Sequence, residues 1–349
     1  MLMRTSAPPA GPAVAASVTV ALWASAFVVI RDLGPVFSPG AMAFLRLLFG
    51  VAALTVILVI SRRRTATAAS RAPRWPRGRG LGLVIAYGVA WFGAYSVVLN
   101  WAEQHLDAGT AALLVNLAPI IVAVYAGFFL GEGFSRMLVL GIVISFSGVV
   151  LITVGGGGAH ADWLGLALGV ITAVLYAAGV LLQKVALRDV DAVTATWLGA
   201  VAGLVATLPF APTAFRELGA ADPGQIAWLV FLGVGPTAIA FTTWAYALAR
   251  TDAGALAATT LAVPAIVIVM SWLFLGELPS AVRIVGGVLC LAGVAIGRGL
   301  LRIRSRRVVG TEVRDVLGDE GASGAEGSGA GGSGAGGSDA GVSGAARTR

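Results

Sequence analysis

The fold is decided by a stretch that occurs twice, LDAGTAALLVNLAPIIVAVYAGFFLGEGFSRMLVLGIVISFSGVVL at residues 106–151 and TDAGALAATTLAVPAIVIVMSWLFLGELPSAVRIVGGVLCLAGVAI at residues 251–296. The two copies align without a gap, at a separation of 145 residues. Matched alanines and valines follow from any apolar composition, but an acid, a proline and an LGE triplet rarely match in register. The chain is therefore predicted to contain an internal repeat, marked by the pairs Asp107/Asp252, Pro119/Pro264 and Glu132/Glu277.

The composition excludes most soluble proteins. The 349 residues are 58% hydrophobic and 12% charged, with a mean hydropathy of +0.89, whereas a soluble domain is about 45–50% apolar and about 25% charged. A helix needs about 20 apolar residues to cross the hydrocarbon core of a bilayer. The sequence predicts an all-α membrane protein with ten transmembrane helices, at 13–31, 39–60, 81–101, 108–130, 137–155, 163–184, 193–211, 225–248, 253–275 and 284–301.

The ten predicted helices form two repeats of five, at 13–155 and 163–301. The register weakens toward the start of each repeat, where Trp23 matches Tyr176 only after a shift of eight residues. Because five is an odd number, the two repeats begin on opposite sides of the membrane. The prediction is therefore of two inverted five-helix repeats.

The distribution of basic residues predicts the orientation. With the N-terminus inside, 17 Arg and Lys residues lie in inner segments and three lie in outer ones, the densest run being between residues 62 and 79. This bias follows the positive-inside rule, and with ten spans it predicts that both termini lie in the cytoplasm. The abundance of Ala and Gly, with Arg in place of nearly every Lys, indicates a high-GC bacterial source, so a bacterial inner membrane is expected. Residues 1–12 are expected to form the cytoplasmic N-terminus. Residues 309–349, rich in Gly, Ser and Ala, are expected to form a disordered cytoplasmic tail.

Several functions are excluded by the same composition. The net charge of +7 and the pI near 10.4 belong to the membrane-flanking loops, so no nucleic-acid partner is expected. A single cysteine, Cys290, cannot form an internal disulfide or a cysteine metal cluster. His105 and His160 lie in predicted outer loops without a third ligand. No metal site, cofactor or catalytic residue is predicted.

Two copies of a pattern, PIIVAVYAGFFLGE (119–132) and PAIVIVMSWLFLGE (264–277), resemble the paired EamA domains of the drug/metabolite transporter superfamily. The segments LWASAFVVIRDLG (22–34) and AFLRLLFG (43–50) share this resemblance. The resemblance implies ten helices, cytoplasmic termini, and export or exchange of amino acids or similar small metabolites. It does not fix the solute.

Inverted repeats are typical of secondary transporters, because rocking one repeat against the other opens a shared site to either side. The predicted function is export of a small polar solute by alternating access, with the lipid bilayer as the other partner. No predicted span carries a mid-membrane carboxylate, so facilitation without proton coupling is an option beside proton antiport. A membrane-embedded enzyme and a non-transporting partner subunit are the alternatives.

The acids of the repeated segment lie at predicted helix ends. Asp107 and Asp252 are expected to cap the helices that follow them. Glu132 and Glu277 follow a Leu-Gly pair, which predicts a structural role in the loop, with proton coupling as the alternative. Pro119 and Pro264 are expected to kink their helices near mid-bilayer, where they could line an interface between the repeats.

Arg46 is expected about 10–12 Å from the outer end of its helix, at 1.5 Å per residue. Such an arginine needs a partner, either a solute carboxylate or another helix. The other predicted substrate contacts are polar or aromatic residues within spans: Trp23, Tyr95, Asn116, Tyr176 and Thr260. Small-residue spacings at Gly165/Gly169 and Gly199/Gly203 permit close helix packing, either within the chain or in a homodimer.

Overall fold

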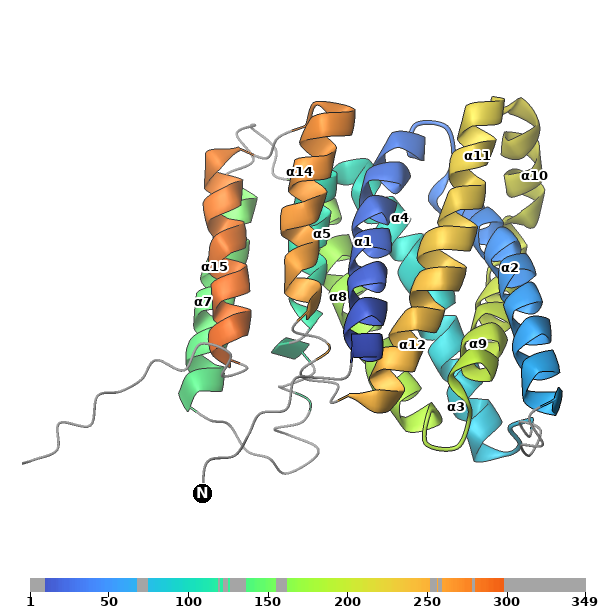
Figure 1. Ribbon diagram of the computed structural model, residues 1–349. Helices are drawn as coiled ribbons and strands as arrows, with labels where there is room; N and C mark the ends of the chain where they lie inside the picture. The colour runs from blue at the N-terminus through green and yellow to red at the C-terminus, as the bar shows by residue number, and fades with distance from the viewer. Residues whose placement is uncertain are drawn as a thin grey trace, which may run out of the picture. The chain divides into compact units, whose positions relative to one another are not determined.

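The computed structural model describes residues 10–67, 75–118, 120, 121, 125, 136–154, 162–251, 256, 259–277 and 280–297. Every regular element within these ranges is helical (Figure 1). The α-helices are α1 (Ala10–Leu33), α2 (Pro39–Thr67), α3 (Arg79–Tyr87), α4 (Tyr95–His105), α5 (Ala108–Val115), α7 (Arg136–Val154), α8 (Trp163–Ala186), α9 (Ala192–Ala206), α10 (Ala211–Ala220), α11 (Pro223–Leu232), α12 (Ala240–Arg250), α14 (Val263–Leu275) and α15 (Ala281–Gly297).

Four further elements join these helices. Two are π-helices that continue a longer helix, η1 (Gly88–Ala94) between α3 and α4 and η3 (Gly233–Ile239) between α11 and α12. Two are short 3₁₀ turns, η2 (Leu208–Phe210) and η4 (Thr260–Ala262).

Five helices are long and apolar enough to cross a membrane, and α9 with α10 make a sixth if this pair, bent by 50°, is one span. The five are 11–33, 39–63, 79–105, 163–186 and 223–250. The predicted all-helical membrane architecture is therefore confirmed in the described ranges. The count of ten stays a prediction, because α7, α14 and α15 contribute shorter apolar helices. Pro119, Glu132 and Asp252 lie outside the described residues.

Aspartates fix where four of these helices begin. In each, the carboxylate accepts a hydrogen bond from the backbone N–H three residues later, which satisfies a donor that the first helical turn leaves unpaired. The pairs are Asp107 with Thr110, Asp162 with Gly165, Asp191 with Thr194 and Asp222 with Gln225, at 2.8–3.0 Å.

Asp162 also contacts His105 at the end of α4, with 2.9 Å between Oδ2 and Nδ1. The hydrogen bond from the Gly165 N–H, followed by the one from His105, lowers the pKa of the Asp162 carboxyl. This hydrogen bond ties the start of α8 to the end of α4.

The internal repeat extends to details that the sequence alone does not reveal. The π-helices η1 and η3 begin at Gly88 and Gly233, which are 145 residues apart and therefore equivalent. Each π-helix packs on a helix of the other repeat, η1 on α9 and η3 on α2. The same reciprocity holds for α1 with α12 and α8 with α4, and for α1 with α14 and α8 with α5.

Glycines bring these partners into backbone contact. A Cβ on Gly50 would lie 3.2 Å from the carbonyl oxygen of Gly233, and a Cβ on Gly203 would lie 3.1 Å from that of Gly88. Gly50 and Gly203 are thus equivalent positions, 153 residues apart. The shift of eight residues predicted near Trp23 therefore applies to the second helix of each repeat as well.

The first helices of the two repeats run in opposite directions. Arg31, at the end of α1, donates to the carbonyl of Glu103 near the end of α4. Gly165, at the start of α8, packs against His105 at that same end of α4. An inverted repeat requires this opposite direction. In Figure 1, α7 and α15 lie side by side, and they pack through Gly293 and Gly141.

The small residues considered for a homodimer are used within the chain. Gly165 and Gly169 meet Leu106 and Leu114, and Gly203 meets Phe92; Gly199 packs on the aromatic ring of Tyr87. A homodimer stays a prediction, without support from these residues.

Substitution of Gly203 tests this packing. An alanine Cβ would lie 2.5 Å from Phe92 Cβ and 3.0 Å from the Gly93 nitrogen, and overpacking of this kind costs about 1–3 kcal/mol. We expect Gly203→Ala to lower the thermal unfolding midpoint of the detergent-solubilised protein. The control Gly82→Ala, where nothing lies within 4 Å of the new Cβ, should leave it unchanged or raised. Equal midpoints for both variants would contradict the packing described.

Candidate functional site

One cavity of about 40 Å³ lies where the two repeats meet. Trp23 of α1 and Tyr176 of α8 both line it, with ring centroids 6.1 Å apart. These residues are equivalent in the repeat, so the cavity lies close to the axis that relates the two repeats. The lining residues are Trp23, Ala26, Phe27, Arg46, Trp91, Tyr95, Leu99, Val115, Asn116, Tyr176, Phe241, Thr260 and Val263.

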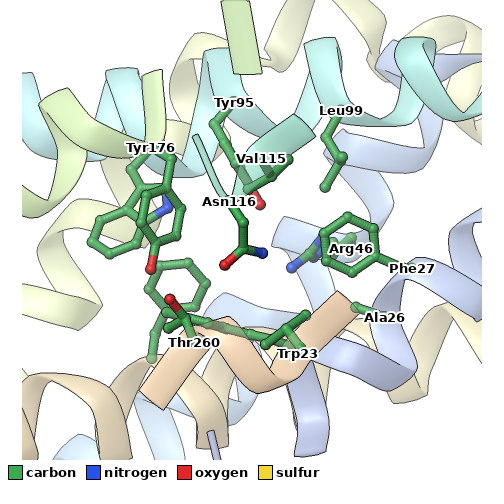
Figure 2. Close-up of a pocket in the computed structure, with 13 residues that line it drawn as sticks. Trp23, Ala26, Phe27, Arg46, Tyr95, Leu99, Val115, Asn116, Tyr176 and Thr260 are labelled. Atoms are coloured by element: carbon green, nitrogen blue, oxygen red, sulfur yellow. The ribbon is translucent and has the colours of Figure 1, made fainter. Parts of the chain in front are cut away.

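All six predicted substrate contacts line this cavity. Figure 2 shows the Asn116 side chain in the middle of the group, with Arg46 on one side of it and Tyr176 on the other. Sequence reasoning missed much of the apolar lining, including Phe27, Leu99 and Val263. Only depth and polarity distinguish residues in an apolar span, and these residues have no polar atom to single them out.

Aromatic rings form one wall. Trp91 of η1 packs against Tyr176 at 5.1 Å and against Phe241 of α12 at 5.0 Å between centroids. Trp23 packs against Phe241 at 5.3 Å and against Trp244 at 4.9 Å. Tilted and edge-on pairs of this kind stabilise beyond their buried area. The wall therefore combines residues from α1, η1, α8 and α12 into one rigid surface.

Arg46 of α2 is the charged residue of the lining. It is 4% exposed, and its Nε donates to Thr237 Oγ1 of η3 at 2.7 Å. Thr237 in turn donates to the Leu232 carbonyl. The Nη1 atom of Arg46 is buried, and no described residue hydrogen-bonds it. Gly199 occupies the equivalent position of the other repeat, so the packing itself needs no arginine here.

Two other lining residues also carry a buried polar atom that no described residue hydrogen-bonds. Asn116 donates through Nδ2 to the Ala112 carbonyl at 2.9 Å, and its Oδ1 has no partner among the described residues. The same holds for Trp23 Nε1. Buried polar atoms are normally hydrogen-bonded, and each exception requires an explanation. The cavity thus presents two donors, from Arg46 and Trp23, and one acceptor, from Asn116.

The backbone is interrupted beside the cavity in both repeats. α5 ends at Val115, so Asn116 follows the helix end. The equivalent residue of Val115 is Thr260, which begins the 3₁₀ turn η4 before α14. Discontinuous helices of this kind form solute sites in many transporters, because their ends offer backbone groups to a ligand.

Pro264 differs from the prediction. It lies in the first turn of α14 and not a dozen residues into a continuous helix. The N–H groups of the first helical turn have no acceptor within the helix, so the N–H that proline lacks is not missed there. The 3₁₀ turn η4 before it interrupts the α-helical hydrogen bonds. Pro264 therefore starts a helix instead of kinking one.

The acids at the helix ends have defined partners. Asp107 caps α5 through the Thr110 N–H and hydroxyl, at 2.8 and 2.7 Å. Glu277 follows the left-handed Gly276 and pairs with Arg31 Nε at 3.0 Å. The two side chains of that pair are 31% and 30% exposed.

Basic residues tie the first and third helices of each repeat together. Arg31 donates to the Glu103 carbonyl at 2.8 Å, and Lys184 donates to the Leu248 carbonyl at 2.8 Å. The two carbonyls are 145 residues apart and the two cations 153 apart, so these contacts are equivalent. Within the described residues, no group of three or more His, Cys, Asp or Glu side chains could hold a metal ion.

Sequence reasoning also missed Glu103. The predicted span ended at residue 101, which placed this acid in a loop. In the structure α4 continues to His105, and Glu103 is 1% exposed. The signal that could have found it is Asp107: a helix cap there leaves no room for a loop between the two helices.

Together, the fold and the cavity define a class: a helical membrane protein with two repeats that meet at a small, polar-centred site, as in secondary transporters. Residues 12–154 and 163–297 each match the EamA-like transporter family. The chain therefore belongs to that family, within the drug/metabolite transporter superfamily.

Relatives support the same class. The chain is 35% identical over 284 residues to a protein of Streptantibioticus cattleyicolor named a probable terminal-alkyne amino-acid exporter, covering 80% of this chain and 90% of the relative. It is 30% identical over 280 residues to an uncharacterized transporter of Archaeoglobus fulgidus, covering 80% and 96%. It is 25% identical over 308 residues to a probable amino-acid metabolite efflux pump of Escherichia coli, covering 85% and 98%.

A solved crystal structure has the same fold, with a TM-score of 0.55 at 18% identity, over 83% of this chain and 98% of that chain. The family and the names of the relatives point to transport and not to catalysis.

Removal of a wall residue tests the aromatic cluster. Trp91 is 1% exposed, and truncating such a side chain to alanine costs about 3–5 kcal/mol through the void it leaves. We expect Trp91→Ala to lower the thermal unfolding midpoint markedly. Trp101→Ala is the control, because Trp101 belongs to the same span and is 42% exposed. A comparable loss in both variants would contradict the description of the cluster.

Proposed function

We propose that the protein exports amino acids or closely related metabolites by alternating access. The observation that carries this proposal is the set of unpartnered polar atoms in the cavity. Arg46 Nη1 and Trp23 Nε1 suit a carboxylate, and Asn116 Oδ1 suits an ammonium group. The aromatic wall suits an apolar side chain. A zwitterionic amino acid offers these three features together, and the names of two relatives agree with it.

The size of the cavity supports a moving carrier. About 40 Å³ holds a few water molecules, whereas sites for small molecules measure about 300–1,000 Å³. An amino acid therefore requires the repeats to separate on one side. The interrupted backbone at Asn116 and Thr260 supplies positions where such a motion changes few hydrogen bonds.

The two repeats are proposed to be inverted in the membrane, with ten helices in all. The reciprocal packing supports this proposal, since exchanging the repeats exchanges each contact for an equivalent one. The contacts of Arg31 and Lys184 with their carbonyl partners lie within one repeat each, so they remain when the repeats separate. The ion pair between Arg31 and Glu277 joins the two repeats, and opening on that side breaks it.

The remaining parts of the proposal concern the location of the protein, its domain bounds and the roles of residues at helix ends. The protein is proposed to lie in a bacterial inner membrane with both termini in the cytoplasm, with repeats at 13–155 and 163–301 and a tail at 309–349. Pro119 and Pro264 are proposed to mark the hinge positions of the two repeats. Glu132, Glu277, Asp107 and Asp252 are proposed to have structural roles at helix ends.

Transport into proteoliposomes tests the solute assignment, with a panel of labelled L-amino acids. We expect flux of at least one amino acid above that of empty liposomes, and no flux of its amine analogue without the carboxylate. Arg46→Gln removes the proposed carboxylate partner and should reduce the flux about tenfold or more, because charge-assisted bonds contribute about 1.5–3 kcal/mol.

Arg216→Gln is the matched control, because Arg216 is an exposed arginine of α10, and its flux should equal that of the unaltered protein. Absence of flux for every amino acid would contradict the proposed function and favour the enzyme or the partner subunit. Flux that is insensitive to Arg46→Gln would contradict the role of Arg46 alone.

Cysteine labelling from either side of the membrane tests the inverted repeats. Asp32 at the end of α1 and Asp189 after α8 are both exposed. In a Cys290→Ser background, we expect a membrane-impermeant maleimide to label Asp32→Cys only from outside and Asp189→Cys only from inside. Labelling of both from the same side would contradict the inverted arrangement, whatever the solute is.

A further inference from the structure

Glu103 of α4 is a buried acid that the proposed solute site does not use. The residue is 1% exposed, and both carboxylate oxygens are buried without a hydrogen-bond partner in the described part of the chain. Glu103 takes part neither in the Arg31–Glu277 ion pair nor in the His105–Asp162 contact. Burial of an ionised carboxylate without hydrogen bonds is costly, so this acid requires an explanation.

Glu103 lies next to the cavity. Tyr95, Leu99 and Glu103 are spaced four residues apart and share one face of α4. Tyr95 and Leu99 line the cavity, and Glu103 is one turn further along. At that end of α4, Arg31 donates to the Glu103 carbonyl and pairs with the half-buried Glu277. The acid thus lies between the cavity and a partly solvated ion pair.

Four charged groups act on the Glu103 carboxylate: Arg31 of α1, Arg46 of α2, Asp107 before α5 and Glu277 after α14. Arg31 is already paired with Glu277, and Asp107 caps α5. On α8, the nearby charge is that of Asp162, which pairs with His105. Arg31 is thus shared with Glu277, whereas Arg46 belongs to neither of these ion pairs and lines the cavity, so Arg46 is the cation that can link Glu103 to the solute site.

Building on the proposed function, we propose that Glu103 is a proton-binding carboxyl linked to the solute site through Arg46. In the empty cavity the ionised Glu103 balances the charge of Arg46. A solute carboxylate bound to Arg46 takes over that role, and Glu103 then binds one proton at a free carboxylate oxygen. The proton leaves when the solute leaves. Solute and proton therefore move in the same direction, one proton with each solute. Export is then driven by the concentration gradient of the solute, and an acidic exterior drives the reverse flux into vesicles.

Two transport measurements test this linkage in proteoliposomes, with each labelled L-amino acid of the panel. The first is counterflow at equal pH on both sides, and the second is accumulation driven by a more acidic exterior. For the unaltered protein we expect counterflow, and accumulation of about tenfold for each pH unit, since one pH unit corresponds to a factor of ten for one proton.

Glu103→Gln mimics the permanently protonated acid. It should retain counterflow within about twofold and lose accumulation, so that the solute only equilibrates. Glu103→Asp should keep both activities. The control Glu217→Gln alters an acid of α10 that hydrogen-bonds Ser38 and should behave as the unaltered protein.

Accumulation by Glu103→Gln equal to that of the unaltered protein, or accumulation only with an acidic interior, would overturn the inference. Failure of the unaltered protein in counterflow with every amino acid would instead overturn the proposed function, so the two failures are distinguishable.

A measurement on the unaltered protein decides the case if Glu103→Gln does not fold. Dicyclohexylcarbodiimide reacts with protonated carboxyl groups in apolar surroundings, and the adduct is located by mass spectrometry of peptides. We expect an adduct at Glu103 under acidic conditions, several-fold less under alkaline conditions, and loss of accumulation in parallel with its formation. Absence of an adduct at Glu103 at any pH would overturn the inference.

Discussion

The structure depends on the approach of two helix backbones where each repeat crosses the other. At Gly50 with Gly233, and at Gly203 with Gly88, no side chain separates the helices. In a bilayer, association gains little from the hydrophobic effect, so close packing of this kind is a main source of attraction between helices. The equivalence of the two contacts also sets the axis between the repeats. Trp23 and Tyr176 meet near that axis, which places the cavity there.

Much of the fold could be read from the sequence, since the aligned copies at 106–151 and 251–296 carry markers that apolar composition cannot imitate. The interruptions within the helices could not be predicted from the sequence. The π-helices each begin at a glycine that packs on the other repeat, and Pro236 lies inside the second one. A glycine or proline in an apolar run does not by itself indicate a π-helix. The break before Pro264 was read as a kink, because a proline inside a long apolar run has the same appearance in either case.

The six polar and aromatic residues expected around a solute come together in one cavity because polar groups in an apolar span face the interior of the helix bundle and not the lipid. Their partners were less predictable. The three-dimensional pairing of the repeats was needed to find that Arg46 donates a hydrogen bond to Thr237. It was also needed to find that Gly199 is the residue equivalent to Arg46. Glu103 was missed because the end of a helix is the least certain part of a hydropathy pattern.

The first repeat has an arginine at position 46, and the second repeat has a glycine at the equivalent position 199. This difference has a thermodynamic consequence. Two halves that pack alike would give inward-facing and outward-facing carriers the same energy, and the unloaded protein would divide its time equally between them. Arg46, together with the buried Glu103 whose equivalent in the second repeat is Leu248, removes this degeneracy. In the proposed alternating-access mechanism, the unloaded protein therefore has a preferred orientation in the membrane.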